Sequence, residues 1–209
     1  MIPAAGHATR LQPLPCSKEV LPVAGRPVMD YLVDRMRAAP CGELRVVTRP
    51  EKLDVVERAE QLGAMVIEGH PRSVAESLSL GMGGLEPDDV VLFGFPDSIW
   101  EPADGFSQLV AMLGDIVLGL FRCQELTRSD VVTVADGLVT GVHVKPEQPP
   151  SDLVWGCLAA RVGIFEELGD HDEPGVYIHG LALEGRVRGV DFGTEFVDIG
   201  TPESLAAAQ

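Results

Sequence analysis

A stretch of small residues near the start of the chain is followed closely by two cations. Ala4, Ala5 and Gly6 open this loop, and Arg10 and Lys18 come after it. Small side chains let main-chain N–H groups approach a ligand, and such groups form a concave site for phosphate oxygens. The guanidinium of Arg10 adds a fixed fork of donors. These residues predict a phosphate-binding loop, and a tight turn with solvated cations is the alternative.

The charge distribution agrees with a confined anion site. Residues 1–50 carry seven basic and four acidic side chains, whereas residues 51–209 carry nine and twenty-eight. A locally basic start on an acidic protein favours a phosphate pocket, with chance clustering as the alternative. The net charge of −16 argues against a protein that binds nucleic acid or a membrane surface.

Other kinds of chemistry have no pattern to support them. The five histidines are scattered without ligand spacing, and the four cysteines form no C-x-x-C pair, so free thiols in a reducing compartment are expected. No apolar run is long enough to span a membrane, and no basic-then-apolar leader opens the chain. A cytoplasmic location is therefore expected.

The elements that must position the loop alternate between strand and helix in the first half of the chain. After a short first strand, apolar residues from Val28 to Met36 recur at helical spacing, and Pro40 ends the run. Further strands are expected at 44–48, 64–69 and 88–98, and helices at 51–63 and 73–82. This is the spacing of βαβ units and predicts a mainly parallel sheet.

The second half of the chain adds antiparallel pieces. Residues 131–144 predict two strands around Asp136-Gly137, a strong hairpin signal, and strands are also expected at 115–121 and 152–165. No linker, low-complexity segment or repeat interrupts the chain. The sequence therefore predicts the α/β class: a Rossmann-like three-layer sandwich with a mainly parallel mixed sheet and antiparallel additions in the second half, formed by a single domain over residues 1–209.

The string IPAAGHATRLQPLPCSKEVLPVAGRPVMDYLV, residues 2–33, carries a specific resemblance. It is similar to the N-terminal signature of the sugar-1-phosphate nucleotidyltransferases, roughly A-G-G-x-G-T-R-L-x-P-x-T-x-x-x-P-K-x-L-L-P-V-x-x-K-P. The matching positions are Thr9, Arg10, Leu11, Pro13, Lys18, Leu21, Pro22, Val23 and Pro27. Details of the string favour the glucose-1-phosphate uridylyl- and thymidylyltransferase members of the family.

Two later motifs resemble those that hold the metal in this family. VVLFGFPDSIW at 90–100 is similar to a strand ending in a metal-binding aspartate, which would be Asp97. FVDIGTPESL at 196–205 resembles the closing D-I-G-T-P-E, with Asp198 as the second carboxylate. Because the ends of parallel strands gather at one edge of a sheet, the two are expected to meet there. The resemblance implies Mg²⁺ as the cofactor, although each aspartate alone is also typical of a turn.

The resemblance also assigns the substrate contacts. VHVKP at 142–146 is similar to V-E-K-P and WGCLAARVGIFEEL to the T-G-x-Y segment, so Lys145 and Gly156 would bind the sugar phosphate. The nucleotide would be bound by Ala4, Ala5, Gly6, Thr9, Arg10 and Ser73.

The implied reaction is attack of a sugar-1-phosphate oxygen on the α-phosphorus of a nucleoside triphosphate, with release of pyrophosphate. Two anions must meet, so neutralising charge and positioning are the main tasks. Arg10 and Lys18 would be the catalytic residues, stabilising the transferred and leaving phosphates. The sugar phosphate is already ionised, so no general base is required. The implied partners are a nucleoside triphosphate and a sugar-1-phosphate, without nucleic acid or membrane, and homo-oligomerisation is left open.

Several positions depart from the family pattern. Ala8 replaces the second loop glycine, Ser73 replaces a glycine near the base, and Val144 replaces the glutamate that touches sugar hydroxyls. The base-reading glutamine has Glu68 as its nearest candidate. Two alternatives therefore stay open: a catalytically degenerate member that binds nucleotide or sugar phosphate and regulates, and a nucleotidyltransferase for a non-sugar phosphate acceptor.

Overall fold

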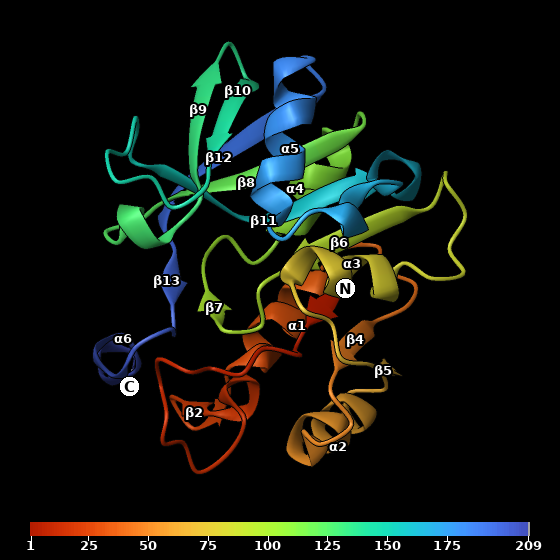
Figure 1. Cartoon of the computed structure of the whole chain (residues 1–209), viewed down its shortest axis with the longest axis vertical. Coiled ribbons are helices and arrows are strands. Elements are labelled where there is room, and N and C mark those ends of the chain that lie inside the picture. The colour runs from red at the N-terminus through yellow and green to blue at the C-terminus, as the bar shows by residue number, and fades with distance from the viewer. Residues whose placement is uncertain (209) are drawn as a thin grey trace.

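The computed structural model describes residues 1–208, and its first half forms a small parallel sheet (Figure 1). Strands β1 (Ile2–Pro3), β4 (Arg45–Thr48) and β5 (Met65–Glu68) lie in the order β1-β4-β5. Both pairings are parallel, with Ile2 opposite Val46 and Val46 opposite Val66. The βαβ alternation in the sequence is thus confirmed for this half, and the small-residue loop leaves the sheet directly from β1.

A six-stranded mixed sheet forms most of the remaining core. Its order is β6-β11-β8-β12-β10-β9. The strands are β6 (Val90–Gly94), β8 (Ile116–Arg122), β9 (Val131–Ala135), β10 (Leu138–His143), β11 (Leu153–Arg161) and β12 (Val187–Glu195). Strand β12 runs parallel to β8, whereas β11 is antiparallel to both β6 and β8. The antiparallel share is larger than the sequence predicts, because the uniformly apolar β11 sits centrally and its composition does not reveal its direction.

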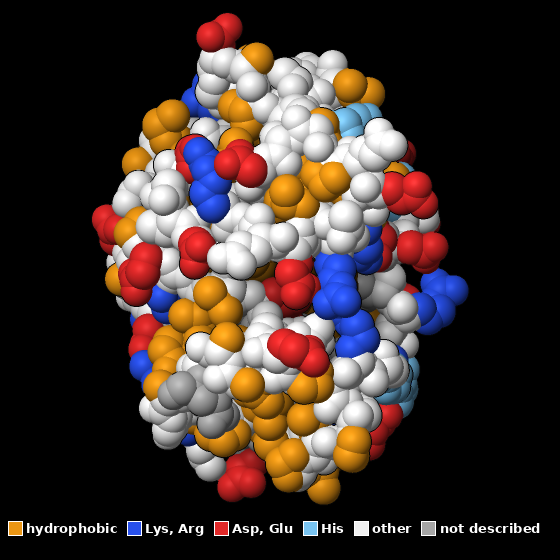
Figure 2. Space-filling view, turned by 90° about the vertical axis from the view of Figure 1, so that its left-hand side faces the viewer, with side chains coloured by type: hydrophobic (Ala, Val, Ile, Leu, Met, Phe, Trp, Pro, Cys, Tyr) orange, Lys and Arg blue, Asp and Glu red, His pale blue; other side chains and the backbone are white. Residues whose placement is uncertain are grey.

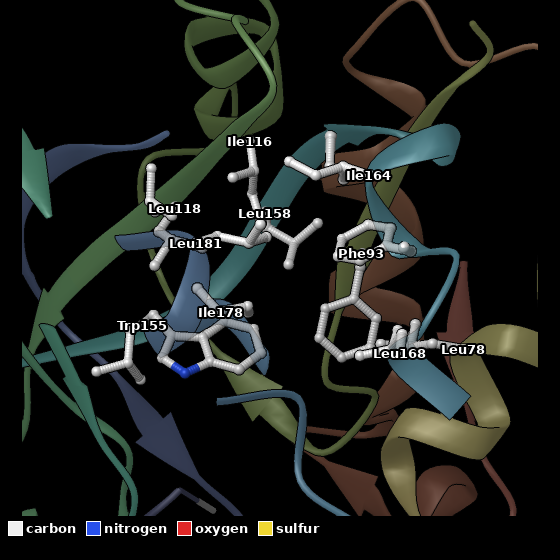
Figure 3. Packing of buried hydrophobic residues seen from close by; sticks show 14 of the residues in the cluster. Leu78, Phe93, Ile116, Leu118, Trp155, Leu158, Ile164, Leu168, Ile178 and Leu181 are labelled. Carbon is white, nitrogen blue, oxygen red and sulfur yellow. The ribbon is translucent and has the colours of Figure 1, made fainter. Parts of the chain in front are cut away.

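Helices cover both faces of this sheet, in keeping with the predicted α/β class, and they are α1 (Met29–Arg37), α3 (Val74–Gly81), α4 (Gly105–Ala111) and α5 (Pro174–Leu183). Helix α2 (Leu53–Gln61) packs against β4 and β5 instead, and α6 (Pro202–Ala207) lies at the C-terminal end. Strand β8 points Leu118 into a core shared with α3 and α5, and points Val117 into a second core shared with α1 and α4. Figure 3 shows the first core, where Leu78 of α3 lies beside Phe93.

Two short ladders lie outside the large sheets. Strands β2 (Pro22–Val23) and β3 (Arg26–Pro27) form a hairpin, and β7 (Ser98–Ile99) pairs with β13 (Val197–Asp198). The C-terminal α6 lies near the β2–β3 hairpin, and a small apolar cluster joins the two (Figure 1). Within residues 1–208, no helix has the length and apolar character needed to cross a bilayer.

Candidate active site

The two aspartates of the predicted metal site lie next to each other on the β7–β13 ladder. Asp198 ends β13 opposite Ser98, and the N–H of Ile199 donates to the carbonyl of Asp97 at 2.8 Å. Figure 2 shows the molecule from this side, with acidic side chains recessed near the middle of the face and basic ones beside them. The two aspartates do lie close together, as predicted. The prediction that the edge of a parallel sheet brings them together is wrong, because the β7–β13 ladder belongs to neither the three-stranded nor the six-stranded sheet.

Lys18 reaches the same two carboxylates from the N-terminal segment. It begins a short 3-10 helix (Lys18–Val20), and its ammonium donates to Asp97 Oδ2. The side chains of Lys18 and Asp97 are only 19% and 11% exposed. Burial lowers the pKa of Lys18, but the charge and hydrogen bond of Asp97, together with the charges of Asp198 and Glu19, raise the pKa by more, so Lys18 is held charged. Burial and the nearby Asp97 charge raise the pKa of Asp198 to about 6, against the charges of Lys18 and Arg10.

The composition of this cluster fits a magnesium ion. Asp97 and Asp198 place two carboxylates side by side, the first buried and the second exposed, and Lys18 neutralises the charge of Asp97. No third metal-ligating side chain completes a cluster within residues 1–208. Mg²⁺ is commonly held by one or two carboxylates, with waters and substrate phosphates as its other ligands. The two aspartates therefore provide a suitable protein share of such a site.

A cavity of about 310 Å³ lies between the small-residue loop and the start of α3. It is lined by five of the predicted site residues, namely Ala5, Gly6, Lys18, Ser73 and Asp97. Ala4 lies buried behind the loop, and its N–H donates to the carbonyl of Val47 on β4 at 2.7 Å. Thr9 and Arg10 are exposed at the far end of the loop. The structure thus collects half of the predicted nucleotide-binding residues, Ala5, Gly6 and Ser73, around one space.

Ser73 shapes one wall of this cavity. Its hydroxyl caps α3 by accepting the N–H of Glu76 at 3.0 Å, as its place before an apolar helical run predicts. Its hydroxyl also lies 3.5 Å from the carbonyl of His171. A serine in place of the family glycine therefore has a local structural role, which leaves its contact with a nucleotide as a prediction.

Ala8 adopts the left-handed conformation that the missing glycine would take easily, with φ of +50°. Ala8→Gly is expected to keep or raise the free energy of unfolding, by up to about 1 kcal/mol, because relief of left-handed strain outweighs the added freedom of the unfolded chain. Ala38→Gly is the matched control, since Ala38 is exposed with φ of −72° and should lose about 0.5–1 kcal/mol. Equal losses in urea denaturation of both variants would contradict this account.

Lys145 belongs to a second polar cluster. Its ammonium is paired with Glu173, its side chain is half exposed, and its backbone has a positive φ of +43°. The Asp130 carboxylate accepts the N–H of Lys145 and, at 3.3 Å, the indole N–H of Trp155. Trp155 packs on Phe95 with ring centroids 5.3 Å apart, and Phe95 lines the 310 Å³ cavity. The Lys145 cluster is therefore joined to the cavity through two aromatic rings.

Gly156 lies in the apolar core rather than in a polar pocket. A Cβ at this position would collide with the ring of Phe196 and meet that of Phe121 at 3.0 Å. Gly156 is connected to the Lys145 cluster through its neighbour Trp155, whose indole N–H donates to Asp130. Close packing explains why a glycine stands here, and its contact with a sugar phosphate stays a prediction.

Burial and the nearby Glu173 charge raise the pKa of Asp130 from 3.8 to about 6. The folded protein therefore holds this proton more tightly than the unfolded chain, and the resulting stability, complete below pH 3.8, is lost as the pH rises through 6. Asp130→Asn stays neutral and keeps an acceptor for Trp155. Relative to the wild type, its free energy of unfolding should rise by up to about 3 kcal/mol between pH 4 and pH 8. A difference independent of pH would refute this assignment.

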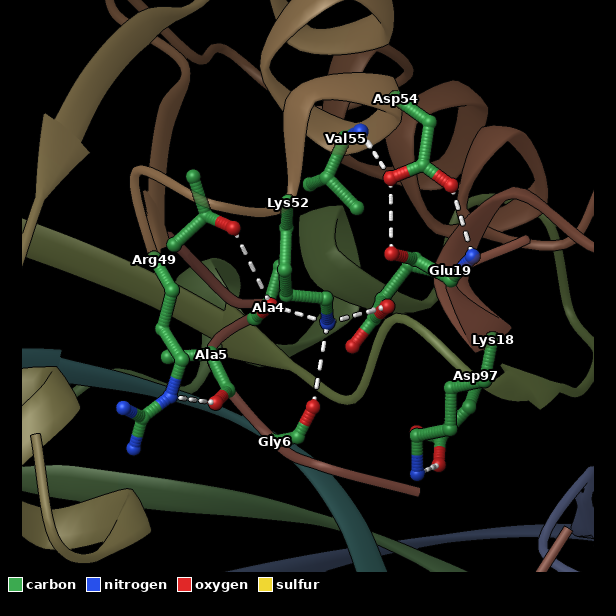
Figure 4. A network of polar contacts seen from close by, with 12 residues as sticks. Ala4, Ala5, Gly6, Lys18, Glu19, Arg49, Lys52, Asp54, Val55 and Asp97 are labelled. Atoms are coloured by element: carbon green, nitrogen blue, oxygen red, sulfur yellow. Dashed lines mark hydrogen bonds and ion pairs between the residues drawn. The ribbon is translucent and has the colours of Figure 1, made fainter. Parts of the chain in front are cut away.

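Three charged residues that the sequence analysis did not identify hold the loop in place (Figure 4). Arg49 and Lys52 donate to loop carbonyls, and Lys52 also pairs with the buried Glu19 at 2.6 Å. These partners are 33 to 48 positions apart, so no local motif joins them. Only the close approach of β1 and β4 brings them together.

Comparisons with known proteins support the resemblance seen in the sequence. Glucose-1-phosphate thymidylyltransferase from Streptomyces griseus is 28% identical over 175 residues, which are 79% of this chain and 48% of that protein. The low-salt glycan biosynthesis nucleotidyltransferase Agl11 from Haloferax volcanii is 27% identical over 165 residues, 72% of this chain and 45% of that protein. The chain thus spans about half the length of these relatives.

Solved structures share the fold closely. A Bacillus anthracis protein described as a glucose-1-phosphate thymidylyltransferase, solved in complex with sucrose, superposes with a TM-score of 0.87 at 19% identity. That match covers 99% of this chain and 92% of the other. A UDP-glucose pyrophosphorylase complexed with UDP-glucose gives a TM-score of 0.84 at 17% identity, covering 99% and 95%. At these identities the match establishes the fold alone.

A family model described as the MobA-like NTP transferase domain matches residues 1–135 of the 209. This range contains the small-residue loop, Lys18, Ser73 and Asp97, which line the 310 Å³ cavity. The match covers more than half of the chain and includes the cations and the first aspartate of the site. The chain therefore belongs to the MobA-like NTP transferase family.

Proposed function

We propose that this protein transfers a nucleotidyl group from a nucleoside triphosphate to a sugar-1-phosphate, giving an NDP-sugar and pyrophosphate. The observation that carries the proposal is the meeting of Lys18, Asp97 and Asp198, of which Lys18 and Asp97 line the cavity beside the small-residue loop. A nucleotidyltransferase needs cations and metal-binding carboxylates where the phosphates of two substrates converge. The names of the relatives favour a sugar phosphate as the acceptor.

The loop and its cations are assigned to the triphosphate. Main-chain N–H groups at Gly6 and His7 bind its phosphates, and Arg10, which has no ion pair within residues 1–208, is free to bind the leaving pyrophosphate. Lys18 stabilises negative charge on the transferred phosphate, and Asp97 holds its ammonium in place before substrate arrives. Because these donors are oriented beforehand, little reorganisation is needed in the transition state.

Magnesium is the proposed cofactor, and Asp97 and Asp198 are its proposed ligands. When bound, the ion neutralises charge on the reacting phosphates, which lets the acceptor anion approach. Without it, the two adjacent carboxylates would repel the same phosphates. The pKa of Asp198 is raised first by removal from water and then by the neighbouring negative charge of Asp97.

Lys145 is assigned to the acceptor phosphate. Lys145→Ala is expected to raise the KM for the sugar phosphate by about tenfold, the cost of one charge-assisted hydrogen bond, with little change in the KM for the triphosphate. Arg186→Ala is a suitable control, because Arg186 forms a comparable exposed ion pair with Asp115. Equal increases in both KM values for Lys145→Ala would remove the assignment.

The proposed function is tested by pyrophosphate release with Mg²⁺. Each common nucleoside triphosphate is combined with a panel of sugar-1-phosphates and of non-sugar phosphates. Release that requires one triphosphate and one sugar phosphate together is the expected result. If pyrophosphate is released only with a non-sugar phosphate as the acceptor, the assignment of a sugar phosphate as substrate is wrong. If no pair of substrates releases pyrophosphate, the transferase proposal is overturned.

A further inference from the structure

Ala4 and Ala5, which open the small-residue loop, are buried, but the part of the loop at Gly6 and His7 has little packing to fix its shape. Residues 6 and 7 are exposed, and a Cβ added at Gly6 would meet nothing within 4 Å. The loop also separates two spaces, because Gly6 and His7 line both the 310 Å³ cavity and a second cavity of about 290 Å³. Side-chain burial therefore does not decide which way the peptide groups at Gly6 and His7 face.

Polar contacts from a single segment fix the loop instead, as Figure 4 shows. Lys52 Nζ donates to the carbonyls of Ala4 and Gly6 at 2.7 and 3.1 Å, and Arg49 Nε donates to the carbonyl of Ala5 at 2.8 Å. Three successive carbonyls are thus held by two cations from the connection between β4 and α2. In a trans peptide the N–H points away from the carbonyl before it, so this leaves the N–H groups of residues 5 to 7 facing away from these cations.

The same connection holds the segment that carries Lys18. Lys52 Nζ is 2.6 Å from Glu19 Oε2, and the Glu19 side chain is only 1% exposed. The Asp54 carboxylate accepts the N–H and the hydroxyl of Ser17 at 2.6 and 2.7 Å. Residues on both sides of Lys18 are therefore tied to residues 52–54.

Arg49 extends this arrangement to the opposite wall of the cavity. Besides Ala5, its guanidinium donates to the carbonyl of Pro71 at 3.1 Å and lies 3.2 Å from His70 Nδ1. The segment around residues 70–71 leads directly into Ser73 and α3. One side chain thus sets the distance between the phosphate loop and the start of α3.

We propose that residues 49–54 form a clamp that holds the loop in the form that binds a triphosphate, with Lys52 as its central positioning residue. The N–H groups of Gly6 and His7 donate to no acceptor within residues 1–208, so they are left for phosphate oxygens. Lys52 does not line the 310 Å³ cavity and acts on the substrate through the loop, whereas Arg49 lines this cavity and can also meet the substrate directly. This inference rests on the proposed function for the identity of the substrate.

The test measures binding of inorganic tripolyphosphate by calorimetry, which needs no turnover. Lys52→Met is expected to weaken this binding by at least about tenfold, since a misplaced loop N–H loses a charge-assisted hydrogen bond to a phosphate oxygen, which is worth about that factor or more. Steady-state kinetics should show the KM for the triphosphate rising and that for the acceptor unchanged. Arg49→Met, expected to weaken binding in the same direction, keeps the test valid if Lys52→Met does not fold.

Arg58→Met is the matched control. Arg58 lies on α2 and pairs with the buried Asp30, but it does not touch the loop. Its loss should lower stability and leave tripolyphosphate affinity unchanged. Wild-type affinity in both Lys52→Met and Arg49→Met, or no tripolyphosphate binding by the wild type, overturns the clamp. Binding that depends on Lys52 in a protein that transfers no nucleotide supports the clamp and refutes the proposed function.

Discussion

Asp97→Asn is expected to reduce the turnover number by about a thousandfold or more. The substitution keeps the shape of the side chain and removes the charge that would hold the cofactor. Charge stabilisation by a bound metal is worth several kcal/mol in such reactions, and each 1.4 kcal/mol is about tenfold in rate. The measurement is pyrophosphate release at saturating Mg²⁺ with the substrate pair that the panel identifies.

The fold should survive this change. Lys18 remains beside Asp198, whose carboxylate acts electrostatically on it, so the buried ammonium is not left without an anion. Asp191→Asn is the control. Asp191 lies in the middle of β12 and forms a half-exposed ion pair with Arg122, so this variant should keep full activity. An Asp97→Asn protein with wild-type turnover would remove Asp97 from the metal site.

Lys18→Met has the second largest expected effect, and it acts on both turnover and stability. Turnover should fall by about a hundredfold or more, as for other preorganised donors to a developing charge. Without divalent metal, the free energy of unfolding at pH 8 should fall by about 3 kcal/mol, because the buried Asp97 carboxylate loses its cation and is left beside the negatively charged Asp198. Thermal denaturation with and without Mg²⁺ gives the readout.

Magnesium should recover more stability in Lys18→Met than in the wild type. In the wild type the Lys18 ammonium already occupies Asp97 Oδ2, so a divalent ion competes with it for that carboxylate. In the variant this competition is gone, and binding to the folded state raises stability by mass action. A smaller Mg²⁺-dependent rise in melting temperature than in the wild type would contradict the shared site.

The local elements were predictable where the chain carries a strong signal of its own. The Asp136-Gly137 pair predicts a hairpin, and both residues have the positive φ that such a turn requires, +51° and +78°. Ser73 predicts the start of α3 in the same way. By contrast α5 was not predicted, because its residues, PGVYIHGLAL, are apolar around the whole helix and include two glycines. Its long contact with β10 and β12 stabilises it.

The candidate site was likewise predictable only where residues form a local sequence motif. The loop, Lys18, Asp97 and Asp198 could be named from their motifs, and the structure brings them together. What joins them could not be predicted, since the β7–β13 ladder has only two residues in each strand. The contacts of Arg49 and Lys52 with the loop and with Glu19 were missed for a related reason: polar contacts between residues far apart in the chain leave no periodic pattern in the sequence.

The most direct measurement of the central claim follows oxygen atoms through the reaction. A sugar-1-phosphate labelled with ¹⁸O at its non-bridging phosphate oxygens is incubated with the enzyme, Mg²⁺ and the triphosphate, and the products are analysed by mass spectrometry. Attack of the acceptor phosphate on the α-phosphorus predicts that all the label appears in the NDP-sugar and none in pyrophosphate. Label in pyrophosphate, or a nucleoside monophosphate with the sugar phosphate unchanged, would contradict nucleotidyl transfer at this site.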